Sequence, residues 1–124
     1  MNALLVRQPW IDLILKGEKT WELRGSRTNT RGPIALVQSG SGTVVGKCEI
    51  VDVIGPLSLA ELRRSKQLHA LKAAQLGSAP YPRTYAWVIR KAKRLRKPIP
   101  YRHKPGAVIW VKLPSPVATK VRAG

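Results

Sequence analysis

The sequence has a single cysteine, Cys48, and two histidines, His69 and His103, among its 124 residues. One cysteine excludes an internal disulfide and a zinc site built from several thiolates. The two histidines are far apart in sequence, so we expect no metal and no cofactor. No apolar run approaches the roughly 18 residues of a membrane span, and Met1–Val6 lacks the charged lead-in of a signal peptide. These absences favour a cytoplasmic protein without a membrane partner.

Acidic residues are scarce, and the second half of the chain has none. All six lie within residues 1–62, where seven basic residues leave a net charge of about +1; residues 63–124 carry sixteen Lys or Arg. Each phosphate that such a surface neutralises releases counterions, which favours a polyanion as partner. RNA is the expected partner and DNA also fits, whereas membrane binding would need a basic amphipathic anchor that the sequence does not show.

Short apolar runs bounded by turn formers predict strands. Gly46 interrupts the longest run and indicates a bulge or a close approach of another segment. Gly55-Pro56 is expected to break the chain after that run. The predicted strands cover residues 3–6, 20–23, 34–38, 43–53, 84–89 and 107–111.

Two helices are expected between these strands. Pro9 lies at the start of a short helix, and Gly17 ends it. A longer helix is predicted over residues 58–76, because Ser58 and Glu61 have capping-box spacing and leucines recur on one face. Gly77 is the expected C-terminal cap of this helix.

Together these elements predict an α+β fold, in which one longer and one short helix cover the openings of a small, partly closed β-barrel. Residues 1–113 would form this single domain, and residues 114–124 would be a basic C-terminal tail. A monomer is favoured.

The segment Gly17–Arg24, GEKTWELR, carries the most distinctive cluster of charged residues. In an extended chain after Gly17, Glu22 and Arg24 share one face, and Lys19 lies close enough to reach over it. A carboxylate flanked by two cations leaves donors for a phosphate or a base edge. The alternative is an ion-pair cluster that only closes a helix–strand corner.

This segment matches the G-x-K-x-x-E-x-R signature of the ASCH domain family, with Gly17, Lys19, Glu22 and Arg24 at its four positions. The preceding RQPWIDLIL and the later TYAWVI are also similar to that family. The resemblance implies a PUA-like β-barrel that binds RNA, with the signature lining a cleft between the barrel and a helix.

Some members of the family are enzymes. The resemblance makes Lys19 and Glu22 candidate catalytic residues of a single-strand ribonuclease. A second branch hydrolyses acetylated cytidine with a threonine nucleophile; the matching position here is Glu22, which argues against that amidohydrolase activity. A third alternative is a ribosome-associated or transcription-related accessory factor.

Further contacts to nucleic acid are expected outside the signature. Trp10 would stack on an unpaired base. Polar or basic side chains in the first half of the chain that suit phosphate or ribose are Thr20, Arg27, Arg31 and Ser39. The basic stretch 90–104 would follow the phosphate backbone, unless it is a solvated loop that touches nothing; its candidates are Arg90, Lys91, Lys93, Arg94, Arg96, Lys97 and Tyr101. Trp21, Trp87 and Trp110 are expected in the core.

Overall fold

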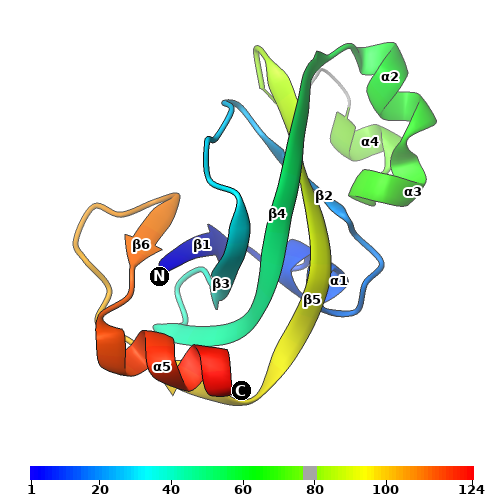
Figure 1. The fold of residues 1–124 in the computed structure, drawn as a ribbon. Coiled ribbons are helices and arrows are strands. Elements are labelled where there is room, and N and C mark those ends of the chain that lie inside the picture. The colour runs from blue at the N-terminus through cyan, green and yellow to red at the C-terminus, as the bar shows by residue number, and fades with distance from the viewer. Residues whose placement is uncertain (77–80) are drawn as a thin grey trace.

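The computed structural model describes residues 1–76 and 81–124 and shows one curled, six-stranded sheet with short helices around it (Figure 1). The strand order is β2-β5-β4-β3-β1-β6, so β2 and β6 are the two edges and the barrel is not closed. The α+β architecture agrees with the prediction. The strands are β1 (Asn2–Val6), β2 (Trp21–Arg24), β3 (Gly32–Gln38), β4 (Thr43–Leu57), β5 (Thr84–Pro100) and β6 (Trp110–Lys112).

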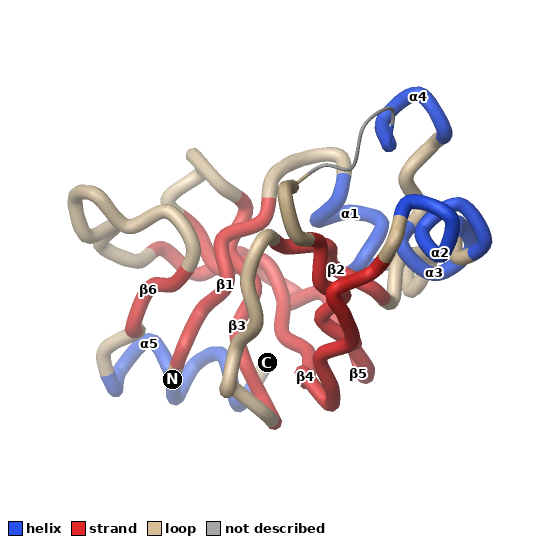
Figure 2. The backbone as a smooth tube through the Cα atoms, turned by 90° about the horizontal axis from the view of Figure 1, so that it is seen from above, coloured by secondary structure: helices blue, strands red, loops and turns tan. Residues whose placement is uncertain are grey.

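Both faces of the sheet are covered, so its central strands are apolar at successive positions. In β1, Leu4 and Val6 point to a core that includes α1 (Trp10–Leu15), whereas Ala3 and Leu5 point to a second core that includes α5 (Ser115–Ala123). The two helices lie on opposite sides of the sheet (Figure 2). A third core joins β2 and β5 to the helices after β4.

The glycine in β4 allows α1 to lie close to the sheet. A Cβ atom at Gly46 would be 2.8 Å from the Lys93 carbonyl oxygen and would also collide with the Leu15 side chain of α1. The sheet register shifts between Val44 and Gly46. The predicted close approach is therefore confirmed.

Gly46→Ala is expected to lower the free energy of unfolding by about 1–3 kcal/mol, because the added methyl group overpacks this contact. Urea unfolding of the variant and the wild type measures the difference. Leu15→Ala removes one of the two colliding groups, so the double variant should cost less than the sum of the two single changes. Equal stability of Gly46→Ala and the wild type would contradict the role given to this glycine.

The segment predicted as one longer helix forms three short ones: α2 (Leu59–Arg64), α3 (Lys66–His69) and α4 (Ala73–Leu76). The capping box of Ser58 and Glu61 is present, which confirms the predicted helix start. The continuous helix is wrong because Ser65 ends α2 and its hydroxyl donates to the Glu61 carbonyl, while Ala70 adopts a left-handed conformation with φ 63°. The cap predicted at Gly77 lies outside the described residues.

Two strands are much longer than predicted. The expected break at Gly55-Pro56 is wrong, because β4 continues through it to Leu57 with a shift in register. The basic residues after Ile89 also stay in β5 as far as Pro100, since they pair with β4 across a bulge near Lys91 (φ 55°). At the other edge, β6 overlaps only the end of the predicted strand 107–111.

The residues expected to form a basic tail make up α5, which packs on the sheet. Val121 is fully buried in the second core, and Ala118 is also buried. Lys47 of β4 donates to the Val121 and Arg122 carbonyl oxygens at 3.2 and 3.1 Å, where a helix C-terminus favours a cation. Within residues 1–76 and 81–124, no helix is long and apolar enough to cross a membrane.

Candidate functional site

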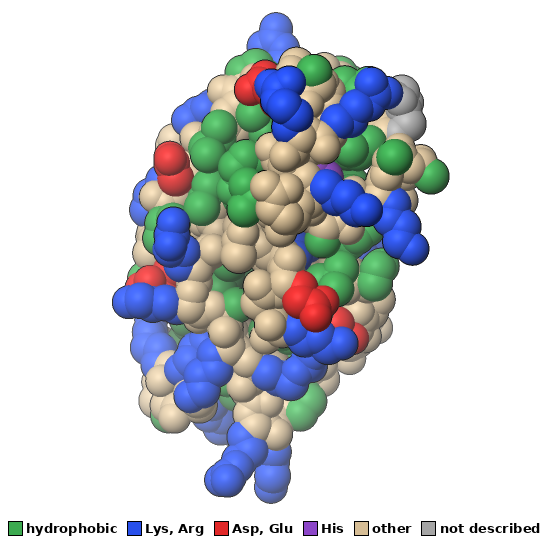
Figure 3. Space-filling view, turned by 90° about the vertical axis from the view of Figure 1, so that its right-hand side faces the viewer, with side chains coloured by type: hydrophobic (Ala, Val, Ile, Leu, Met, Phe, Trp, Pro, Cys, Tyr) green, Lys and Arg blue, Asp and Glu red, His purple; other side chains and the backbone are tan. Residues whose placement is uncertain are grey.

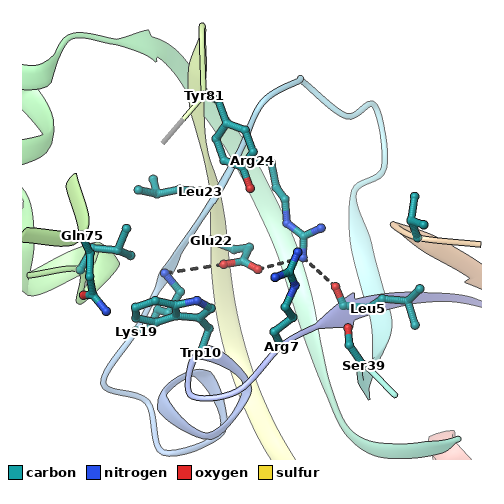
Figure 4. Close-up of a pocket in the computed structure, with 12 residues that line it drawn as sticks. Leu5, Arg7, Trp10, Lys19, Glu22, Leu23, Arg24, Ser39, Gln75 and Tyr81 are labelled. Carbon is teal, nitrogen blue, oxygen red and sulfur yellow. Dashed lines mark hydrogen bonds and ion pairs between the residues drawn. The ribbon is translucent and has the colours of Figure 1, made fainter. Parts of the chain in front are cut away.

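A cavity of about 350 Å³ opens where β1, α1 and β2 meet the segment that follows α3 (Figure 4). Its wall combines charged and polar side chains, within and outside the signature, with aromatic and aliphatic ones. The lining comes from chain segments that are distant in sequence: Leu5, Arg7, Trp10, Lys19, Glu22, Leu23, Arg24, Ser39, Leu71, Gln75, Tyr81 and Val108.

Lys19 lies at the bottom of this cavity and is only 1% exposed. Its ammonium donates to the carbonyl oxygens of Trp21 at 2.8 Å and His69 at 2.6 Å, and its Nζ lies 3.6 Å from Glu22 Oε1. The ammonium also lies over the Trp10 ring, 5.4 Å from its centroid. Burial lowers the pKa of Lys19, and the Glu22 carboxylate opposes that shift. Two of the three ammonium protons are therefore used in hydrogen bonds to backbone carbonyls, and Glu22 lies at ion-pair distance.

Glu22 lies between two cations. Its Oε2 accepts from Arg24 at 2.9 Å, on the side opposite Lys19. Arg24 NH2 also donates to the Leu5 carbonyl oxygen at 2.7 Å, and its guanidinium lies over the ring of Trp87. Glu22 is 5% exposed, and it is the one carboxylate among the described residues lining the cavity. Its unused lone pairs are therefore the main acceptors that the cavity offers to a ligand.

The buried His69 supports this arrangement, and nothing in the sequence pattern pointed to it. Its Nδ1 accepts from the Leu71 backbone N–H at 2.9 Å, so the proton is on Nε2, which donates to the Leu62 carbonyl at 2.6 Å. Its own carbonyl accepts from Lys19. Burial lowers the pKa of this imidazole, and the nearby Lys19 lowers it further. The neutral ring thus joins α2 and α3 to the signature lysine.

The free energy of unfolding should fall as the pH is lowered below 6.5, the ordinary pKa of histidine. In that range the unfolded chain binds a proton that the folded chain does not, until the lowered pKa of folded His69 is reached. Unfolding measured at several pH values down to about 5, above the ordinary range of carboxyl groups, tests this. His69→Gln should flatten the slope and His103→Gln should not; the same slope in both variants would contradict the assignment.

The sequence profile of the ASCH domain matches residues 4–99, which is most of the chain. The chain belongs to the ASCH domain family. Its fold is similar to the crystal structure of ASCH from Zymomonas mobilis, with a TM-score of 0.72 and 16% identity over 98% of this chain and 93% of that one. Two single-residue mutants of the Zymomonas protein are also similar, each at 16% identity over 98% of this chain. The Ser to Ala mutant gives a TM-score of 0.74 with 94% of that chain covered, and the Tyr to Phe mutant gives 0.75 with 96% covered. No curated protein matches by sequence.

In this ASCH domain the cavity brings together five of the residues predicted from the sequence. Trp10, Lys19, Glu22, Arg24 and Ser39 all line it. ASCH domains have a PUA-like fold that is often linked to RNA binding. The signature residues thus lie at a pocket of the size that accommodates a small ligand.

Other predicted contacts lie outside the cavity lining. Thr20 is half-buried, and its backbone bonds to Leu68 and Ile89. Arg27 lies over the Tyr85 ring, and Arg31 donates to carbonyl oxygens of its own loop. Thr20, Arg27 and Arg31 are therefore not part of the cavity wall.

The basic stretch of the ASCH domain is divided between two sides of β5. Arg94 pairs with Asp12 of α1 at 3.0 Å. Lys93 donates to the Gly124 carbonyl oxygen, and Lys91 lies 3.6 Å from Glu49 in a separate depression beside α5. Tyr101 is half-buried against the second core, its hydroxyl bonds to His103, and its ring meets the His103 ring edge to face.

The core tryptophans agree with the prediction. Trp87 is buried, and Trp110 stacks on it at 5.7 Å between centroids. Trp21 packs against the third core. Burial raises the pKa of the Cys48 thiol to about 12, so it is not a nucleophile at neutral pH. Residues 1–76 and 81–124 contain no group of three His, Cys, Asp or Glu side chains suited to a metal.

Sequence reasoning missed several residues of the cavity. Arg7 follows β1 directly, and its proximity to Pro9 and Trp10 was the available signal. Gln75 comes from α4, Tyr81 from the chain just before β5, and Val108 from the loop before β6. No local pattern marks these three, because they reach the cavity only through the fold.

Proposed function

We propose that this protein binds RNA and holds one unpaired nucleotide in the cavity at the ASCH signature. The observation that carries the proposal is the cavity itself, which combines aromatic side chains, a buried carboxylate and basic groups at one place. A volume of about 350 Å³ suits one nucleoside rather than a longer segment of chain.

The arrangement of the side chains supports a base inside and a phosphate outside. The Trp10 and Tyr81 side chains lie on different sides of Glu22 and offer aromatic surface for stacking (Figure 4). Arg7 is exposed and has no ion-pair partner in the described parts of the chain, so its guanidinium is available to a phosphate at the mouth.

The charge of the surface supports a polyanion. Lys and Arg side chains are visible from the top to the bottom of the face in Figure 3, with acidic side chains at several places among them. The formal net charge is +17. RNA is favoured over duplex DNA because sequence-selective proteins bind RNA mostly through unpaired bases that can enter a pocket.

Binding of a labelled single-stranded RNA to Trp10→Ala and Arg7→Ala tests the proposal. We expect each variant to bind roughly 10-fold more weakly, through lost stacking or a lost phosphate contact. Arg64→Ala, at an exposed position of α2, is the matched control and should change the affinity little. The proposal fails if wild-type protein binds no RNA at low salt. Binding to ribosomes without affinity for short RNAs would instead support an accessory factor.

A ribonuclease is the second candidate, and the lowered pKa of Lys19 beside Glu22 favours it. No threonine is among the described residues that line the cavity, which argues against an amidohydrolase with a threonine nucleophile. Incubation of labelled single-stranded RNA with pure protein tests cleavage. Loss of cleavage in Glu22→Gln, with retention in Glu18→Gln, would support it; intact RNA after long incubation would exclude it.

A further inference from the structure

The hydrogen-bonding groups around Glu22 define which base edge the cavity accepts. Two donors of Lys19 are used on the carbonyl oxygens of Trp21 and His69, and the ammonium is only 1% exposed, so it acts on the cavity through the positive charge it places 3.6 Å from Glu22 Oε1. Lys19 and Arg24 approach the carboxylate from opposite ends, as Figure 4 shows. Each carboxylate oxygen retains acceptor capacity, because the two oxygens together have about four lone-pair positions.

We propose that the cavity selects guanine, with Glu22 accepting from the N1–H and the 2-amino group of the base. This inference rests on the proposed function, since it specifies the nucleotide held at the same site. Guanine is the standard base that presents two adjacent donors on its Watson–Crick edge, and a carboxylate presents two adjacent acceptors. Adenine and cytosine offer a single amino group beside a ring acceptor. Uracil places its N3–H between two carbonyl oxygens, which would face the negative charge of Glu22.

Arg24 completes the match on one side of the carboxylate. Its NH2 nitrogen uses both hydrogens on Leu5 and Glu22, whereas NH1 and Nε make no hydrogen bond within the described residues. Guanine has an acceptor, O6, next to N1–H. In this orientation O6 faces an Arg24 donor, while N1–H and the 2-amino group each face one oxygen of the Glu22 carboxylate. One donor and two acceptors of the protein thus meet one acceptor and two donors of the base. The 2-amino group then lies towards Glu22 Oε1, which faces Lys19 at 3.6 Å and retains acceptor positions.

The aromatic side chains are consistent with this orientation. Trp10 and Tyr81 both line the cavity near Glu22, so a flat base whose edge meets the carboxylate can also contact a ring. Stacking accepts every base, so the hydrogen bonds to Glu22 and Arg24 determine selectivity.

The test uses pentanucleotides of otherwise identical sequence with G, A, C, U, inosine or 1-methylguanine at the central position. Inosine lacks the 2-amino group, and the methyl group of 1-methylguanine replaces N1–H. We expect guanine to bind best and uracil worst, with a loss of roughly 10-fold for inosine and more for 1-methylguanine. Equal affinity for guanine and inosine would overturn the inference and leave RNA binding intact, whereas no binding of any oligonucleotide would overturn the proposed function itself.

Glu22→Gln tests the protein side. The amide keeps the size of the side chain but replaces one acceptor by a donor, so guanine should lose its advantage over the other bases while binding through the basic surface persists. Glu18→Gln, an exposed neighbour in the same segment, should keep the preference. If Glu22→Gln does not fold, as judged by its thermal unfolding, the oligonucleotide series with wild-type protein decides alone. A folded Glu22→Gln that still prefers guanine would overturn the inference.

Discussion

Lys19→Met is expected to lower the free energy of unfolding by about 3–5 kcal/mol, the cost of breaking a buried ion pair by removing one partner. Methionine fills a similar volume but donates no hydrogen bond. The carbonyl oxygens of Trp21 and His69 would lose their donor, and Glu22 would keep only Arg24. An unsatisfied buried polar group is costly because it has given up its water.

Urea unfolding of Lys19→Met and Lys16→Met measures this effect. Lys16 is an exposed lysine at the end of α1, so its replacement should change stability by less than about 0.5 kcal/mol. Similar stability of the two variants would contradict the structural role of Lys19. The predicted loss would mean that weak RNA binding by a Lys19 variant reports unfolding, so the exposed Arg7 gives the cleaner test of RNA binding.

RNA binding is expected to weaken steeply with salt, which is the largest effect on affinity that we predict. For single-stranded RNA the slope of log K against log salt is about −0.7 per phosphate contact, so about six contacts would cost roughly 300-fold between about 50 and 200 mM salt. The excess of basic residues after residue 62 is the reason to expect several such contacts. Titration of a labelled RNA at four or five salt concentrations gives the slope.

Replacing Arg90, Arg96 and Lys97 together by glutamine tests where these contacts lie. All three side chains are exposed on β5, and none has an ion pair in the parts of the chain that the structure describes. The slope should become shallower by about 0.7 for each lost contact, while the preference among bases stays the same. Arg63→Gln and Arg64→Gln on α2 form the comparison. An unchanged slope would show that β5 does not contact RNA.

The stability of Lys19→Met and the salt dependence of RNA binding report on two different roles of the basic residues, which the sequence alone does not distinguish. Exposed cations on β5 would provide affinity without selectivity, whereas the buried cluster would provide selectivity with little net attraction for phosphate. Lys19 is a predicted RNA contact, and in the fold its ammonium donates to the carbonyl oxygens of Trp21 and His69. Its contribution to the site is to hold Glu22 in place and to attach α3 to β2.

The local features of the sequence predicted much of the fold. The start of α2 follows from Ser58 and Glu61, because a capping box needs only residues three apart. Alternation in TYAWVI places Tyr85 and Trp87 on the same side, and both are in the first core. The close approach at Gly46 was also expected from the chain alone.

Features that depend on distant partners were not predictable. A basic strand such as residues 90–100 has little apolar alternation, and it stays extended because β4 supplies hydrogen-bond partners along its length. The segment after Ser58 has leucines at suitable spacing for one helix but forms three, and contacts of His69 with the Leu62 carbonyl and with Lys19 stabilise this arrangement. Residues 114–124 have too few apolar side chains to predict a helix, and they form one against Leu95 and the rest of the second core.

By itself the sequence determined the charge of the surface, the start of the helices, the alternation in the strands and the signature that indicates the ASCH family, since these are properties of composition and short spacing. The tertiary structure decided which charges are free. The Lys19 ammonium meets the His69 carbonyl across 50 residues of chain, a contact that buries this basic side chain and joins α3 to the signature. Only the fold brings Arg7, Gln75, Tyr81 and Val108 to the same cavity, because each comes from a different segment.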